Sequence, residues 1–334
     1  MELAASLHSE AVAPDADASI AALIQQHSAN ADRFFRKAVE LGRDRVEPAT
    51  FLYLGQLSNA AEAVAFYEQG LSGLRDELEV LTQAGIADDD DAIVELRRKM
   101  ASVLCSITEI YMTDCCDEPQ AEEVCTNNTA QAIQLDPHSP EAYQTLASVL
   151  LSKCMPDEAL NAISHSLTLW SLADPNTWPS YPTRLATSKI LMEVGKDDEA
   201  ASVLETVLKE NDEDLELWYL FAWCYYRMGG GTQCSNNEDE DMDASDDRNV
   251  PIEDKVEAFV DAKECLEKLL ELAQKNPDEA DPAMVQHASE MLQEVSTLVA
   301  QHPLLVKRIE EAHQAAEDDA MGMLQGDDDD EMEM

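Results

Sequence analysis

The side chains best suited to chemistry in this sequence form one dense aromatic stretch, Trp218–Tyr226, which reads W-Y-L-F-A-W-C-Y-Y. Their spacing places them on two faces of a single α-helix. The first face carries Trp218, Phe221, Ala222 and Tyr225. The second face carries Tyr219, Trp223 and Tyr226. Aromatic rings attract cations and apolar side chains through their faces. The stretch therefore predicts a helix with one core face and a second face that binds or packs against something else.

Catalytic chemistry has little support in the sequence. It contains no Gly-rich phosphate loop, no nucleophile elbow and no cluster of histidines. The eight cysteines include no C-x2-C pair, and the seven histidines are scattered without partners at metal-ligand spacing. Without a recognisable leader, we expect these cysteines to be reduced and to act as small apolar residues. We predict a protein that is not an enzyme, with no catalytic residue, no metal and no cofactor.

Charge narrows the class of partner. The chain has 69 acidic and 22 basic residues, a net charge of −47 and a pI near 4.1. Nucleic acids and anionic membranes need Lys or Arg to neutralise phosphates, so both are disfavoured, and a basic partner is favoured. Acidity that serves only solubility is the alternative. The sequence contains no apolar run long enough to span a membrane, and its first residues resemble neither a secretory signal nor a transit peptide.

Apolar residues recur with helical periodicity along the chain, and no stretch alternates with period two for long. We predict an all-α fold. A first helix is expected near Ser19 and a second one capped by Ser28 or Asn30. Later helices are expected at residues 51–57, 63–81, 92–114, 121–135, 140–152, 156–170, 183–194, 197–210, 215–228, 251–275, 283–301 and 303–316.

Composition divides the chain into one folded array and three unstructured segments. Residues 1–15 are predicted to be flexible, and residues 16–316 to form the array. Within it, residues 235–250 are an acidic low-complexity insertion that we expect to be disordered. Residues 317–334 hold nine acidic and no basic residues, which predicts a disordered acidic tail.

The helix pairs repeat with a period near 34 residues. The unit that begins at Pro140 places small residues at Ala147 and Ala159, and the same positions recur at Ala200 and Ala222. Counting 34 residues back from Trp218 reaches Arg184. This pattern resembles the tetratricopeptide repeat (TPR) family, in which small residues let two helices approach closely. The resemblance implies a right-handed α-solenoid of about six helix pairs with a C-terminal capping helix.

In that family the first helix of each pair lines a concave groove. Residues at the groove positions are candidate partner-binding residues. They are Glu109, Asp114, Glu141, Gln144, Glu193, Glu216, Tyr219, Trp223, Tyr226, Glu290 and Glu294. Such a groove is aromatic and acidic, which suits an extended Lys/Arg-rich segment. Packing of Tyr219, Trp223 and Tyr226 against the next helix is the alternative.

The combination of acidic TPR array, late acidic loop and acidic tail resembles the family of fungal dedicated assembly chaperones for large-subunit ribosomal protein four. The resemblance implies that the groove shields a long basic loop of that newly made ribosomal protein and delivers it to the pre-ribosome. It implies residence in cytoplasm and nucleus, and we expect a monomer when no client is bound. Two alternatives stay open: a TPR scaffold subunit of a multiprotein complex, and an acidic histone chaperone.

Overall fold

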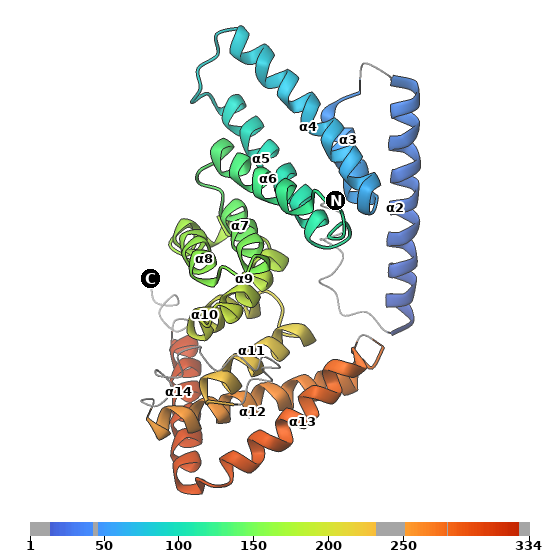
Figure 1. The fold of residues 1–334 in the computed structure, drawn as a ribbon. Helices are drawn as coiled ribbons and strands as arrows, with labels where there is room; N and C mark the ends of the chain where they lie inside the picture. The colour runs from blue at the N-terminus through green and yellow to red at the C-terminus, as the bar shows by residue number, and fades with distance from the viewer. Residues whose placement is uncertain (1–13, 43–45, 232–250, 279, 327–334) are drawn as a thin grey trace, which may run out of the picture. The chain divides into compact units, whose positions relative to one another are not determined.

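The computed structural model describes residues 14–42, 46–231, 251–278 and 280–326, and these residues contain helices but no strand (Figure 1). The predicted all-α class is confirmed. The chain divides by internal packing into two units, Met1–Trp178 and Pro179–Met334. We call them unit 1 and unit 2.

Unit 1 is built from helices that pack in consecutive pairs. Helix α3 packs against α4, α5 against α6, and α7 against α8. The bounds are α2 (Pro14–Gly42), α3 (Pro48–Leu57), α4 (Ala60–Gln83), α5 (Asp91–Met112), α6 (Ala121–Leu135), α7 (Pro140–Ser152) and α8 (Pro156–Trp170), followed by a 3-10 turn at Pro175–Thr177.

Unit 2 continues the same arrangement. Helix α9 packs against α10 and α11 against α12, while α13 and α14 both pack against α12. The bounds are α9 (Tyr181–Glu193), α10 (Asp197–Leu208), α11 (Leu215–Met228), α12 (Ile252–Lys275), α13 (Pro282–Val299) and α14 (Pro303–Gly326).

Helix starts follow the local sequence. Ser139 caps α7 by accepting a hydrogen bond from the Ala142 N–H at 3.2 Å, and Pro140 follows at the first helical position. At the start of α5, Asp90 accepts from the Ala92 N–H at 3.0 Å, so this member of an aspartate run, Asp88–Asp91, stabilises the helix N-terminus. Asp214 caps α11 in the same way.

Small residues sit where paired helices cross. Ala147, Ala159, Ala200 and Ala222 are all fully buried, as the repeat pattern predicts. A side chain of one carbon lets two helix backbones approach, and the larger neighbouring residues then fill the space between successive pairs. The helical hairpin is thus the repeating structural element in both units.

The N-terminal region differs from the prediction. One helix, α2, replaces the two that were expected, and Ser28 and Asn30 lie inside it rather than capping a second helix. The reason is local: neither Gly nor Pro occurs between Pro14 and Gly42, so nothing ends the helix earlier.

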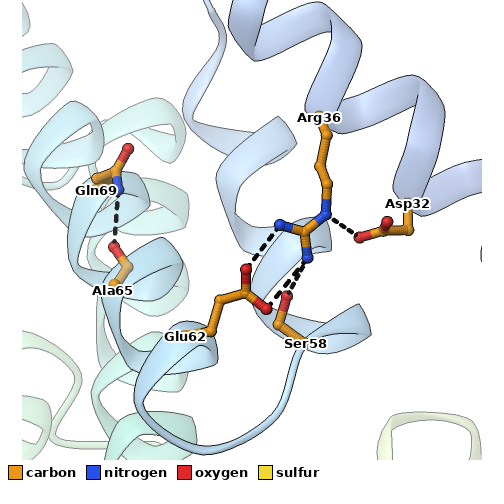
Figure 2. Close-up of polar contacts among 6 residues, drawn as sticks. All are labelled: Asp32, Arg36, Ser58, Glu62, Ala65 and Gln69. Atoms are coloured by element: carbon orange, nitrogen blue, oxygen red, sulfur yellow. Dashed lines mark hydrogen bonds and ion pairs between the residues drawn. The ribbon is translucent and has the colours of Figure 1, made fainter.

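Arg36 attaches α2 to the first hairpin (Figure 2). Its guanidinium donates to Asp32 Oδ1 at 2.7 Å, to Glu62 Oε1 at 2.7 Å and to Ser58 Oγ at 3.2 Å. Glu62 belongs to α4, and Ser58 directly follows α3. One side chain therefore links three helices at a half-exposed position.

One segment boundary also shifts. Helix α14 extends to Gly326, so residues 317–326 of the predicted tail are helical. The whole of the predicted insertion at 235–250 lies outside the described residues. The handedness of the solenoid stays a prediction.

Candidate partner-binding site

Helix α11 carries the aromatic stretch of unit 2, and its first face packs inward. Phe221 and Ala222 are buried, while Trp218 and Tyr225 are half-buried. The rings of Trp218 and Phe221 lie 6.1 Å apart, as do those of Phe221 and Tyr225. This face is a core face, as the repeat register predicts.

The second face meets a histidine that the sequence analysis did not select. Tyr219 and Trp223 are half-buried, and His287 of α13 lies beside both. The ring centroids are 5.9 Å apart for Tyr219–His287 and 5.6 Å apart for Trp223–His287. Tyr219 Oη and His287 Nδ1 are 2.9 Å apart and share a hydrogen bond. We call these three residues the aromatic cluster.

His287 could have been found from spacing. It precedes Glu290 by three residues and Glu294 by seven, so all three share one face of α13. The expected groove residues of α13 therefore already marked that face. What the spacing could not show is that this face meets Tyr219 and Trp223 across the helix interface.

Tyr226 does not belong to the exposed surface. Only 3% of it is accessible, and its ring packs on Trp223 at 5.7 Å and against Phe259 of α12 at 6.2 Å. Gly231 closes the other side, where an added Cβ would come within 2.4 Å of the Tyr226 ring. The structure therefore corrects the prediction for Tyr226: α12 and the turn after α11 make it a core residue.

Exposed carboxylates flank the aromatic cluster in sequence on both helices. Glu216 precedes Tyr219 by three residues and pairs with Lys189 Nζ of α9 at 2.5 Å. On α13, Glu290 follows His287 by three residues and accepts a hydrogen bond from Gln286 Nε2 at 3.0 Å. Glu193 and Glu294 are also exposed. Unit 2 thus combines half-buried rings with accessible negative charge.

Unit 1 contributes carboxylates of its own. Glu141 of α7 accepts a hydrogen bond from Ser102 Oγ of α5 at 3.3 Å. Burial raises the pKa of Glu141, and the charge of Glu109 raises it further. Desolvation also raises the pKa of Glu109, although this side chain keeps part of its surface exposed. A cationic partner would relieve both effects, because it stabilises the ionised carboxylates.

Two other predicted residues of unit 1 have different environments. Asp114 Oδ2 accepts a hydrogen bond from the Ala60 N–H at 3.3 Å, at the start of α4. Because Asn59 makes no side-chain cap there, Asp114 stabilises that helix end. Gln144 is half-buried on α7. The predicted groove residues are therefore divided between the two units, and one continuous groove stays a prediction.

The structure brings together three possible metal ligands that are distant in sequence. Donor atoms of Asp261 and Glu264 on α12 and His313 on α14 lie within 4.8 Å of one another. His313 Nε2 is 3.8 Å from Asp261 Oδ1, and Glu264 is exposed. We interpret this group as a polar contact that joins α14 to α12.

Buried thiols give no sign of a nucleophile. Burial raises the pKa of Cys105 to about 12 and that of Cys224 to about 12, so both are thiols at neutral pH. Among the described helices, none has the length and apolar content that crossing a bilayer requires.

Two curated relatives of this chain are named assembly chaperones. It is 34% identical over 197 residues to the "probable assembly chaperone of rpl4" of Schizosaccharomyces pombe, covering 58% of this chain and 56% of that protein. It is 35% identical over 207 residues to the protein of the same description in Emericella nidulans, covering 58% and 49%. The chain thus spans about half the length of these curated relatives. No family model matches it.

A solved structure agrees with these relatives. The "Assembly Chaperone of RpL4 (Acl4) (Residues 1-338)" is 32% identical to this chain and superposes with a TM-score of 0.57. The match covers 60% of this chain and 76% of that one. Both sequence and paired-helix architecture therefore agree, and the chain belongs to the TPR-type family of proteins named assembly chaperone of RpL4.

Proposed function

We propose that this chain is a dedicated chaperone of a ribosomal protein of the RpL4 type, which holds an extended Lys/Arg-rich segment of that client until delivery to the pre-ribosome. The observation that carries the proposal is the match to two curated relatives and one solved structure that are named as assembly chaperones of RpL4. The proposal includes a presence in both cytoplasm and nucleus, where such a client is made and used.

The chemistry of the chain supports a basic client. An unassembled Lys/Arg-rich segment binds RNA and aggregates, because its charges have no partner. A net charge of −47 attracts it. In unit 2, Tyr219 and Trp223 offer ring surface for aliphatic stems and guanidinium groups, with Glu216 close in sequence.

Isothermal titration with S. pombe RpL4 tests the proposal. We expect one-to-one binding that weakens as sodium chloride rises from 0.05 to 0.5 M, because salt screens the charges. The pair Glu216→Gln/Glu290→Gln should weaken binding by roughly three- to tenfold, in line with rim charges worth under about 1.4 kcal/mol together. The control pair Glu205→Gln/Glu213→Gln removes equal charge from other exposed positions of unit 2.

Other outcomes would narrow or exclude the proposal. Equal affinity for RpL4 in both variant pairs would exclude Glu216 and Glu290 from the client site. Failure to bind RpL4 at all, together with tight binding of core histones, would favour the histone-chaperone alternative. An affinity that does not change with sodium chloride concentration would favour the alternative of a scaffold subunit with a neutral partner.

A further inference from the structure

The ends of α4 and α5 in unit 1 form an open groove that the proposed function does not use. Its volume is about 620 Å³. Its floor is apolar and consists of Val80 and Leu81 from α4 and Ala92 and Leu96 from α5. Val80 is 65% exposed, whereas Leu96 packs against the core of unit 1. The floor is thus fixed to the core at one side and open to solvent at the other.

The rim of this α4–α5 groove is acidic. Asp76, Glu77 and Glu95 line it. Its one cation, Lys99, lies with Nζ 3.5 Å from Glu95 Oε1, so its charge is already compensated. The aspartate run that begins α5 adds further negative charge next to the groove. A cationic partner is therefore favoured over an anionic one.

The dimensions of the groove suit a helix. Its α5 side runs from Ala92 to Lys99, which is about 10 Å at 1.5 Å per residue, or roughly two turns. An apolar channel between two helices takes a third helix whose apolar residues recur at i, i+3, i+4 and i+7. An extended strand would leave its backbone donors without partners there, because helices α4 and α5 already use theirs internally.

We propose that the α4–α5 groove docks an amphipathic, basic helix of a partner protein, with its apolar side chains on Val80, Leu81 and Leu96. Lys and Arg side chains of that helix pair with the acidic rim. A second copy of this chain fits poorly, because its net charge of −47 would repel this rim. The groove belongs to unit 1, whereas the aromatic cluster belongs to unit 2.

Fluorescence anisotropy with a designed peptide tests the inference on the full chain. The probe is a fourteen-residue helical peptide of Leu and Lys, with Leu at i, i+3, i+4 and i+7. A matched peptide carries Glu in place of Lys. We expect the Lys peptide to bind and the Glu peptide not to bind. Val80→Gln should weaken Lys-peptide binding about tenfold, because it removes an apolar contact from the floor.

Matched variants separate a site from general charge attraction. Leu172→Gln is the control for Val80→Gln, since Leu172 is 96% exposed elsewhere in unit 1. The rim variant Asp76→Asn/Glu77→Gln/Glu95→Gln should weaken binding at least as much as Val80→Gln. Its control, Glu68→Gln/Asp117→Asn/Glu123→Gln, removes three exposed charges of unit 1 away from the groove and should change affinity less than twofold.

Several results would overturn the inference. The first is that the Lys peptide binds the Val80→Gln variant as tightly as it binds the unchanged chain. The second is that the Lys peptide and the Glu peptide bind the unchanged chain with equal affinity. A dimer in sedimentation that Val80→Gln converts to monomer would assign the groove to a second copy. RpL4 affinity should be unchanged in Val80→Gln. A parallel loss would make the groove part of the client site instead.

Discussion

Arg36 in unit 1 and Arg184 in unit 2 both join neighbouring helices, but they do so at opposite extremes of burial. The Arg36 side chain is 38% exposed and is bound by side-chain oxygens of Asp32, Ser58 and Glu62. The Arg184 side chain is 2% exposed. It donates to the Pro179 carbonyl at 3.0 Å, to the Thr206 carbonyl at 3.0 Å and also to Glu210.

The difference shows how an acidic chain uses its few cations. At the surface, Arg36 competes with water and is compensated by full carboxylates. In the interior, Arg184 is satisfied largely by neutral carbonyl and hydroxyl oxygens, with Glu210 at the edge. Both arrangements place basic groups against the chain's own oxygens. The acidic excess therefore remains at the surface, where a basic partner can meet it.

The largest effect should come from Arg184. Arg184→Ala leaves two backbone carbonyls of unit 2 without their donor and opens a cavity between α9 and α10, which should cost about 3 kcal/mol or more. We expect the melting temperature of unit 2 to fall by roughly 6–12 °C in calorimetry. Arg98→Ala, at a 61% exposed side chain, is the control. A loss below about 1 kcal/mol would show that the buried arginine is not an anchor.

Arg184 also shows what the sequence could and could not predict. The 34-residue count placed it at the register position that Trp218 holds one repeat later, yet burial of an arginine there depends on Thr206 of α10 and on Glu210 just after that helix. Helix-boundary residues such as Pro, Gly and Asp-Pro predicted the bounds of α6, α7, α8 and α11, because these sequence signals are local. Interhelix partners are not local, so His287 was missed and Tyr226 was assigned to the surface.

A smaller effect, of opposite sign, should come from a half-buried carboxylate. Burial raises the pKa of Asp261 to about 6, and His313 opposes that rise. The folded chain therefore binds more protons than the unfolded chain between about pH 4 and 6, and stability falls as pH rises through that interval. Asp261→Asn removes the ionised form. At pH 7 we expect a gain on the order of 1 kcal/mol, discounted for the 26% exposure of the side chain.

Urea denaturation at pH 4, 5, 6 and 7 measures this gain. The difference between Asp261→Asn and the unchanged chain should be smallest at pH 4, where the folded Asp261 is protonated and its unfolded carboxyl is only about half ionised, and should grow up to pH 7. The control Asp254→Asn changes an exposed carboxylate of the same helix. A gain that is equal at every pH would assign the effect to packing rather than to charge.

The smallest effect should come from Arg36, and it decides whether exposure or the number of hydrogen bonds sets the strength of an anchor. Arg36→Gln removes contacts to three residues, but carboxylates at the surface regain water when the arginine is lost, so the cost should stay below about 1 kcal/mol. The cost of Arg36→Gln should also shrink in 0.5 M sodium chloride, whereas the cost of Arg184→Ala should not, because salt screens only accessible charge.

Hydrogen exchange gives a second test. In Arg36→Gln, exchange should quicken within α2 alone. The control Lys37→Gln breaks one exposed ion pair inside that helix and should leave exchange unchanged. If Arg36→Gln instead destabilises unit 1 as strongly as Arg184→Ala destabilises unit 2, hydrogen-bond number outweighs burial, and the contrast between the two arginines fails.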